Sequence, residues 1–351
     1  MSWESNVRKV VPYVPGEQPK AENMIKLNTN ECPYPPSPKV MEAMQNLSAN
    51  CMRLYPDPAV TDLRQALADY YKVKIEQVFV GVGSDDVLAM SFLTFFNSEK
   101  PILFPDITYS FYDVWAELYK IPYKQPKLDE NFCIRKEDYM VENGGIIFPN
   151  PNAPTGVCEN LEFIESILKE NQDVIVIIDE AYIDFGGVSA LELLPKYENL
   201  LVVRTFSKSR SMAGMRIGYA MGSEELIHAL NVVKHSYNSY TMNQPSICMG
   251  VASIEDEEYF KEKVGKIIAT REQFKKDLKE LGFSFPDSKS NFVFATHKTK
   301  KAKDIFEAAK KEGIFLRYFN RPRIDNYLRI SIGTEEEMKE LVEFLKKDLN
   351  K

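Results

Sequence analysis

The chain alternates between short apolar runs and amphipathic stretches through its first two thirds. Residues 174–178 and 200–203 are apolar runs of the kind found in strands buried on both faces. Residues 61–71 carry Leu63, Leu67 and Tyr70 at helical spacing, with Thr61 as the expected N-cap. The same patterns predict strands over 77–82, 101–104, 145–148 and 217–221, and helices over 85–96, 109–119, 161–170 and 224–233. Strands separated by helices predict an α/β fold with a mainly parallel, mixed sheet flanked by helices.

The pattern changes near residue 255, where a smaller α+β unit is predicted. A long, highly charged helix is expected over 256–281. Strands at 291–295, 314–317 and 328–331 and helices at 301–312 and 335–349 follow it. The first 36 residues are rich in Pro and Asn and predict an extended arm, after which a short helix is expected over 41–47. We therefore expect an arm and part of the small domain in residues 1–50, a large cofactor-binding domain in 51–255 and a small domain in 256–351.

Composition and charge narrow the class of protein. The 351 residues are 44% hydrophobic and 27% charged, as in ordinary globular proteins, and the net charge of −7 argues against a nucleic-acid partner. The five cysteines are dispersed, which is typical of reduced thiols in a cytoplasmic protein. Three histidines without ligand spacing predict no metal site. No apolar run approaches the ~20 residues that span a bilayer, so we expect no membrane partner.

Lys208 follows the strand at 200–203 and is the first candidate for chemistry. The hydroxyls of Thr205 and Ser207 flank it, and Arg216 adds a guanidinium eight residues further on. An amine beside hydroxyls and a fixed positive charge can hold a phosphorylated aldehyde as a Schiff base. Taken alone, the lysine fits an exposed position in a polar loop better, because most lysines are exposed. The motifs at neighbouring strand ends reverse that preference.

A second motif, at residues 80–86, follows a strand and opens a helix. Its glycines resemble a dinucleotide fingerprint, but Asp86 stands where the third glycine belongs, which argues against an NAD-dependent oxidoreductase. The small residues leave backbone N–H groups free at the helix start, where Ser84 and Asp85 could hold one phosphate. A helix capped by one of these side chains, without a ligand, is an equal alternative.

Further strand ends carry polar or aromatic side chains. Asp179 follows a buried strand at the edge where open parallel sheets bind ligands, and Tyr182 lies three residues on. The carboxylate needs a positive partner there, such as a protonated ring nitrogen, unless it caps the next helix. Asn152 lies in an Asn- and Pro-rich loop that could be a plain turn, and Tyr109 either covers a flat ligand or packs in the core. One ligand with a phosphate, a ring nitrogen, a phenolic oxygen and an aldehyde would satisfy them all: pyridoxal 5'-phosphate.

With these motifs the chain resembles the fold-type-I pyridoxal-phosphate-dependent aminotransferases, most closely their histidinol-phosphate branch. The resemblance covers nearly the whole chain. Asp179 to Tyr182 and Ser207-Lys208 with Arg216 resemble the superfamily as a whole, whereas motifs in the arm and near the C-terminus are more specific for the branch. The branch motifs are PYVPG at 12–16, LNTNECPY at 27–34 and LRISIGT at 328–334, and YPD at 55–57 also contributes to the resemblance.

The resemblance implies a role for each site residue. Lys208 would bind the cofactor aldehyde and later transfer the proton, and Asp179 would pair with the ring nitrogen. Tyr182 would donate to the phenolic oxygen, and Tyr109 would stack on the ring. The cofactor phosphate would be held by Ser84, Asp85, Thr205, Ser207 and Arg216, and by Tyr55 of a neighbouring subunit, which implies a homodimer with shared sites. The family commonly has Asn where this chain has Ala153, so a further phenolic-oxygen contact is assigned to Asn152 or, alternatively, to Asn150.

The resemblance also implies the substrates. In related enzymes the arginine that matches Arg329 binds a substrate carboxylate, and in the histidinol-phosphate branch a phosphate takes that place, with Arg317 nearby. Tyr13 and Asn30 would complete the pocket. The implied reaction is transamination of L-histidinol phosphate with 2-oxoglutarate, giving imidazole-acetol phosphate and glutamate, in histidine biosynthesis. An aromatic-amino-acid aminotransferase, a threonine-phosphate decarboxylase on the same scaffold and a catalytically silent cofactor-binding protein are the alternatives.

Overall fold

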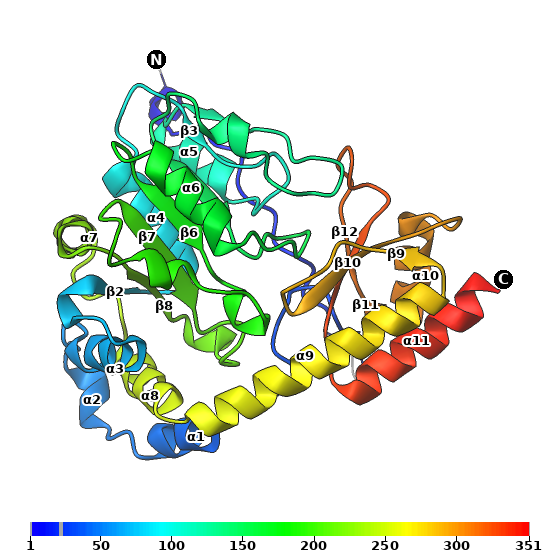
Figure 1. Ribbon diagram of the computed structural model, residues 1–351. Coiled ribbons are helices and arrows are strands. Elements are labelled where there is room, and N and C mark those ends of the chain that lie inside the picture. The colour runs from blue at the N-terminus through cyan, green and yellow to red at the C-terminus, as the bar shows by residue number, and fades with distance from the viewer. Residues whose placement is uncertain (1, 21–23, 351) are drawn as a thin grey trace.

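The computed structural model describes residues 2–20 and 24–350, and its largest element is a seven-stranded sheet (Figure 1). The strands run in the order β2-β8-β7-β6-β5-β3-β4. Their bounds are Val78–Gly81 (β2), Ile102–Leu103 (β3), Tyr123–Lys124 (β4), Ile146–Pro149 (β5), Val176–Asp179 (β6), Leu200–Thr205 (β7) and Gly218–Met221 (β8). β8 is antiparallel to both of its neighbours, and the other pairs are parallel. The predicted mixed, mainly parallel sheet is therefore confirmed.

Helices cover both faces of this sheet. Ile177, Leu201 and Val203 face a cluster that includes side chains from α4 (Ser84–Phe95) and α5 (Tyr112–Tyr119). The alternate strand residues, among them Ile178 and Val202, face a second cluster with α6 (Leu161–Glu170). The remaining helices of this region are α3 (Thr61–Tyr71), α7 (Glu224–Tyr237) and α8 (Gln244–Ile254). Strands buried on both sides explain the continuous apolar runs in the sequence.

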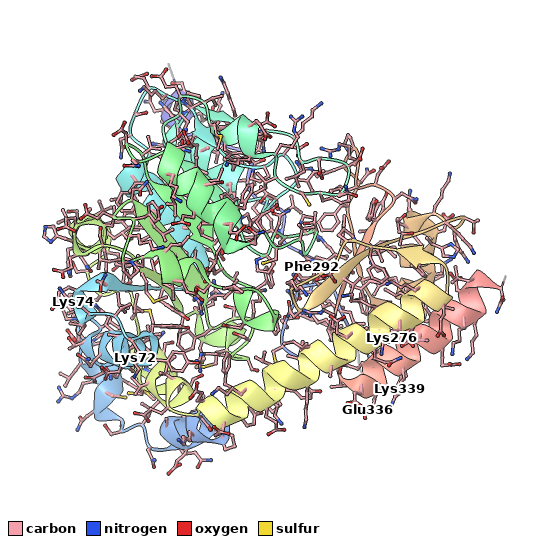
Figure 2. The ribbon with its side chains drawn as sticks, in the orientation of Figure 1. Lys72, Lys74, Lys276, Phe292, Glu336 and Lys339 are labelled. Carbon is pink, nitrogen blue, oxygen red and sulfur yellow. The ribbon has the colours of Figure 1, made fainter. Side chains whose placement is uncertain are left out.

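A smaller unit follows, built on an antiparallel sheet in the order β12-β13-β10-β9. These strands span Phe283–Ser284 (β9), Phe292–His297 (β10), Arg317–Tyr318 (β12) and Leu328–Ser331 (β13). The long helix α9 (Glu257–Glu280), together with α10 (Ala302–Lys311) and α11 (Glu335–Leu349), covers it. Exposed charged side chains such as Lys276 and Lys339 lie on the outer faces of α9 and α11, whereas Phe292 lies on the side of the small sheet that faces the large one (Figure 2).

The N-terminal segment runs from the large unit to the small one as an extended arm (Figure 1). Strand β1 (Ile25–Lys26) pairs in parallel with β11 (Ile314–Phe315), and Leu27 joins the core of the small unit. Helix α1 (Pro38–Gln45) then packs against α8, and α2 (Asn50–Arg53) follows it. Short 3-10 helices span Trp3–Asn6, Ile75–Gln77, Lys136–Tyr139, Ile183–Phe185, Ala190–Leu193 and Ala213–Met215. The domain boundaries at residues 50 and 255 stay a prediction.

Several helix ends differ from the sequence expectations. Thr61 is the first residue of α3 and not its cap, because the Asp57 carboxylate accepts the Thr61 N–H at 2.8 Å. The helix expected from residue 109 begins at Tyr112, which leaves Tyr109 in a loop. Helix α4 is capped by Gly83, so neither Ser84 nor Asp85 caps it. Among residues 2–20 and 24–350, no helix has the length and apolar character needed to cross a membrane.

Candidate active site

Lys208 lies in the loop after β7, at the carboxyl edge of the large sheet. Its Nζ donates to the Thr29 carbonyl oxygen at 3.3 Å and lies 5.7 Å from the centre of the Tyr182 ring. The lysine is half-buried and lines a cavity of about 150 Å³ between the two sheets. The predicted residues that share this cavity are Tyr13, Asn30, Tyr109, Tyr182, Arg317 and Arg329. The structure therefore brings the candidate catalytic lysine and all four candidate substrate residues together.

Asp179 ends β6 and is buried, as the apolar run before it requires. Tyr112 Oη donates to Asp179 Oδ2 at 2.9 Å, and the Ala181 N–H donates to Oδ1 at 3.2 Å. Burial raises the pKa of Asp179 from 3.8 to about 6, although both hydrogen bonds oppose the shift. No cation of the chain pairs with Asp179 among the ion pairs of the described residues. A protonated ring nitrogen placed here would supply the missing positive charge.

A cradle for an anion forms where α4 begins beside β8. Gly83 has φ +88°, and a Cβ on it would lie 2.5 Å from Arg216 Nη2. A Cβ on Gly218 would lie 2.2 Å from the Ser84 backbone nitrogen, so both positions require glycine. Helix α4 has no side-chain cap at its start, which leaves the first N–H groups available for a phosphate. Arg216 completes the positive field of this helix N-terminus.

The hydroxyls of Thr205 and Ser207 lie next to this cradle. Thr205 pairs with Gly218 across β7 and β8, and its Oγ1 donates to Ser207 Oγ at 3.0 Å. Asp85 contributes its backbone, because its carboxylate is engaged: Arg216 Nη2 lies 3.3 Å from Oδ2, and Tyr109 Oη donates to Oδ1 at 2.7 Å. The last bond also fixes the Tyr109 ring at the cavity wall. Burial, and then the charge of Asp85, raise the pKa of Tyr109 well above its usual value.

Tyr182 is held by the loop that follows β1. Asn30 Nδ2 donates to Tyr182 Oη at 2.9 Å, and Ser331 Oγ donates to Asn30 Oδ1 at 3.0 Å. Asn30 has φ +56°, a left-handed conformation that asparagine tolerates better than most residues. The Tyr182 ring also packs edge-on against Phe292, with ring centres 5.1 Å apart. The phenol is therefore oriented from the small unit while its ring faces Lys208.

Two arginines from the small sheet point at the same cavity. Arg329 of β13 donates from Nη2 to the Asn28 carbonyl oxygen at 2.9 Å, while its buried Nε has no hydrogen-bond partner. Desolvation lowers the pKa of Arg329, and the neighbouring charge of Arg317 lowers it further. Two guanidinium groups so close, one of them buried with an unused donor, favour an anionic ligand.

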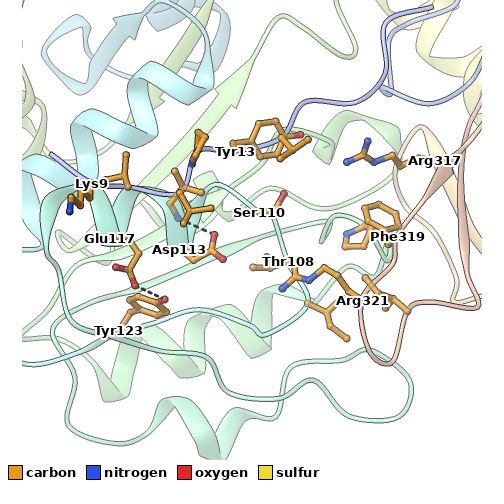
Figure 3. Close-up of a pocket in the computed structure, with 18 residues that line it drawn as sticks. Lys9, Tyr13, Thr108, Ser110, Asp113, Glu117, Tyr123, Arg317, Phe319 and Arg321 are labelled. Atoms are coloured by element: carbon orange, nitrogen blue, oxygen red, sulfur yellow. Dashed lines mark hydrogen bonds between the residues drawn. The ribbon is translucent and has the colours of Figure 1, made fainter. Parts of the chain in front are cut away.

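An outer cavity of about 670 Å³ adjoins the inner one (Figure 3). Tyr13, Thr108, Arg317 and Phe319 line both cavities. Tyr13 is stacked on Phe111 with ring centres 4.2 Å apart, so the N-terminal arm forms part of the wall. Figure 3 shows Arg317 and Arg321 on one side of the outer cavity and the carboxylates of Asp113 and Glu117 towards the other. Together the two cavities form one route from the surface to Lys208.

Comparisons with known proteins place the chain in a family. The sequence pattern of "Aminotransferase class I and II" matches residues 22–345. The chain belongs to this family. It is 52% identical to the histidinol-phosphate aminotransferases of Clostridium botulinum strain Okra, over 99% of both chains, and of Lactococcus lactis strain IL1403, over 100% of this chain and 98% of the other. The predicted resemblance, the aminotransferase class of enzyme and the pyridoxal-phosphate cofactor are confirmed.

Solved structures have the same fold. The histidinol-phosphate aminotransferase of Clostridium acetobutylicum superimposes with a TM-score of 0.85 at 24% identity, covering 93% of this chain and 99% of the other. The enzyme from Sinorhizobium meliloti, solved in complex with pyridoxal-5'-phosphate, has a TM-score of 0.85 at 22% identity, covering 93% and 91%. These likenesses confirm the predicted fold class. The donors described above also fit the cofactor: a cradle for a phosphate, an acid for a ring nitrogen and an amine for an aldehyde.

Three residues with predicted cofactor contacts, Asn152, Asn150 and Tyr55, are engaged with other groups or lie away from the site. Both amide hydrogens of Asn152 are engaged, with the Ile107 carbonyl oxygen and Thr155 Oγ1, each at 3.0 Å. Asn150 exchanges hydrogen bonds with the backbone of Glu159. Neither side chain lines the cavity, and Ala153 lines it instead. Tyr55 is 82% exposed and lies against Tyr240, away from the cavity of its own chain.

Other residues at the site were not identified from the sequence. Tyr112, the donor to Asp179, was read as one position in a helix, and nothing in its local pattern distinguishes it from a core tyrosine. Thr29 lies within a motif that was recognised, but its contact with Lys208 is made by the backbone, which sequence does not reveal. Asp113 lines the outer cavity, but an acidic residue in the first turn of a helix is common and does not mark a site in the sequence.

Proposed function

We propose that this aminotransferase converts L-histidinol phosphate and 2-oxoglutarate into imidazole-acetol phosphate and glutamate. The observation that carries the proposal is Arg329: its buried Nε is unpartnered, and it faces the Lys208 cavity beside Arg317. Two guanidinium groups can hold a phosphate dianion through several charge-assisted hydrogen bonds. Relatives that are 52% identical over the full chain and carry the name histidinol-phosphate aminotransferase support the same substrate.

The residues around the cavity receive distinct tasks in this proposal. Pyridoxal phosphate, when bound, supplies an electron sink for the carbon that loses its proton. Lys208 would hold the cofactor through its aldehyde, and its amine, when free, would be the base that takes the proton from the substrate Cα. Asp179 keeps the ring nitrogen protonated, and Tyr182 and Tyr109 orient the ring. The α4 N-terminus, Thr205, Ser207 and Arg216 hold the cofactor phosphate.

Among the described residues, Tyr182 makes the contact with the phenolic oxygen of the cofactor without help from Asn152 or Asn150. The amides of Asn152 and Asn150 are engaged with protein groups, and Ala153 has no donor. Asn30 donates to Tyr182 Oη, which leaves the phenol proton free to be donated to a ligand. We therefore transfer the role that was expected for Asn152 to the pair of Tyr182 and Asn30.

We infer that the working enzyme is a cytoplasmic homodimer. Tyr55 and Tyr240 are exposed as a pair of tilted rings, and Met44 and Met52, close to Tyr55 in the sequence, are also exposed. Exposed apolar and aromatic side chains of this kind favour a protein interface. In the dimer Tyr55 would reach the cofactor phosphate of the partner. The five cysteines are all free, which supports a reducing compartment.

The test compares substrates and maps the reactive lysine. Specificity constants for histidinol phosphate and for phenylalanine, each with 2-oxoglutarate, should favour the phosphate by more than about a hundredfold, since two charge-assisted bonds are at stake. Borohydride reduction of the cofactor-bound enzyme, followed by peptide mass analysis, should label Lys208. Preference for phenylalanine, release of carbon dioxide from threonine phosphate without glutamate formation, or a label on another lysine would refute the proposal.

A further inference from the structure

A buried cluster of charges lies behind the strand ends that carry Lys208 and Asp179. Arg204 of β7 donates from Nε to Glu180 Oε2 at 2.9 Å, and its Nη2 lies 2.8 Å from the same oxygen. Its Nη1 lies 3.4 Å from Asp184 Oδ1 and donates to Tyr71 Oη at 3.1 Å. The Glu180 side chain is fully buried, and the Arg204 side chain is 7% exposed. The Arg204 and Glu180 charges are thus removed from solvent, whereas the Asp184 side chain is 25% exposed.

The cluster is saturated by its own members, so it is not a ligand site. Glu180 also accepts from Ser189 Oγ at 2.8 Å and from the Ala190 N–H at 2.6 Å. Asp184, the second acid, accepts from Ser209 Oγ at 2.5 Å through its other oxygen. Glu180 and Asp184 belong to the segment after β6, whereas Arg204 and Ser209 belong to β7 and the loop that follows it. The cluster therefore ties two loops together.

Members of the cluster are interleaved with residues of the active site along the chain. Glu180 immediately follows Asp179, and Asp184 lies two residues after Tyr182. Ser209 immediately follows Lys208. The backbone continues the connection, because the Glu180 N–H donates to the Val203 carbonyl oxygen at 2.7 Å. A shift of either loop would therefore change the separation between the amine and its partners across the sheet edge.

We propose that the Arg204–Glu180–Asp184–Ser209 cluster is a positioning device for the reaction. It fixes the Lys208 loop relative to the loop that carries Asp179 and Tyr182, and the bond from Ser209 to Asp184 is its direct tie to the lysine. This inference rests on the roles proposed above for Lys208 and Asp179. A displacement of about 1 Å between reacting groups can lower a rate by about a hundredfold, so a clamp of this kind bears on turnover.

If the cluster served only the stability of the fold, its variants would behave differently. Buried ion pairs often contribute little net stability, and breaking one destabilises the fold wherever it lies. Asp348 and Lys300 supply a matched control, because their ion pair at 2.9 Å joins two segments of the small unit and the Asp348 side chain is 8% exposed. Neither residue lines the inner or the outer cavity. Comparing this pair with the cluster separates positioning from stability.

The experiment uses the holoenzyme and the variants Ser209→Ala, Ser209→Thr, Asp184→Asn and Asp348→Asn. Ser209→Ala should lower kcat about tenfold while KM for histidinol phosphate stays within about twofold, since ground-state binding is not touched. Its dissociation constant for pyridoxal phosphate, measured by quenching of protein fluorescence, should rise about threefold or more. Ser209→Thr keeps the hydroxyl and should restore both values, and Asp348→Asn should change only the melting temperature.

The outcomes separate the inference from the proposed function. If borohydride labels Lys208 in the wild-type enzyme but Ser209→Ala and Asp184→Asn match Asp348→Asn in kcat and cofactor affinity, the positioning role is wrong. If the label falls on another lysine, the proposed function itself is wrong. Should Asp184→Asn fail to fold, Ser209→Ala, which removes one hydroxyl, still decides between a clamp and a purely structural cluster.

Discussion

Replacing Asp179 with asparagine in the cofactor-free enzyme should change how stability depends on pH. Burial raises the pKa of Asp179 from 3.8 to about 6 in the folded chain. The difference of roughly two units corresponds to about 3 kcal/mol, at about 1.36 kcal/mol per unit. Because the folded state holds the proton more tightly than the unfolded state, this contribution is fully present below pH 3.8 and is lost as the pH rises through about 6.

Urea unfolding of the two cofactor-free proteins at a single protein concentration, between pH 4 and pH 8, measures this effect. Asparagine mimics the protonated acid and can still accept from Tyr112, so the two proteins should have similar stability near pH 4. Towards pH 8 the variant should become the more stable by up to about 3 kcal/mol, obtained from the midpoint shift and the common m value. The contributions of all other titrating groups to the unfolding free energy cancel, because both proteins contain these groups.

Bound pyridoxal phosphate should favour the wild-type enzyme over Asp179→Asn. With a protonated ring nitrogen opposite Asp179, the carboxylate gains a partner and its pKa falls, so wild-type enzyme should bind pyridoxal phosphate more tightly than Asp179→Asn at pH 8. Tyr112→Phe provides a second check, because loss of a hydrogen bond to the charged form raises the Asp179 pKa further. Parallel pH profiles of wild-type and Asp179→Asn apoenzyme, within about 0.5 kcal/mol, would show that burial does not govern this carboxyl.

Substitutions at three further positions test the anion cradle and the cavity. Gly83→Ala should weaken pyridoxal phosphate binding at least about tenfold, because the residue has φ +88° and its Cβ would meet Arg216. Equilibrium dialysis measures the dissociation constant, and an unchanged value would contradict the role of this glycine in the anion cradle. Tyr109→Phe keeps the ring but removes the hydrogen bond to Asp85, so kcat should fall less than about fivefold. Tyr109→Ala should lower kcat much further, because it removes the ring that covers the cofactor. Arg317→Gln should raise KM for histidinol phosphate about tenfold or more in steady-state assays, because the Arg317 side chain lines the cavity, and it should leave thermal stability unchanged. An unchanged KM would show that Arg317 does not bind the substrate phosphate.

The sequence predicted the architecture well where local pattern and burial coincide. The apolar run at 174–178 could only be a strand covered on both faces, and β6 is such a strand. Helix ends were predicted less well. The Thr61 N–H is satisfied by a side chain four residues earlier, and a cap at that distance is not visible in the pattern of α3. Helix α8 was missed because its residues are apolar on nearly all sides and show little periodicity.

The site was predictable in its side chains and not in its backbone contacts. Lys208, Tyr182 and Arg329 were identified from strand ends and motifs, and the fold brings them to one cavity. Asn152 was assigned a ligand because its loop suggested a free amide. The fold instead uses that amide to hold the loop, through Ile107 and Thr155, and only the tertiary structure decides between these uses.

Three consecutive residues of the small unit touch three different members of the catalytic group. The carbonyl oxygens of Asn28 and Thr29 accept hydrogen bonds from Arg329 and Lys208, and the Asn30 amide donates to Tyr182. The Ser331 N–H donates to the Leu27 carbonyl oxygen and the Asn30 N–H donates to Ser331 Oγ at 2.9 Å, so this segment is attached to β13. A rotation of one sheet past the other would therefore change the contacts of Lys208 and Tyr182 together, whereas the contact between Arg329 and Asn28 would move as one body with β13.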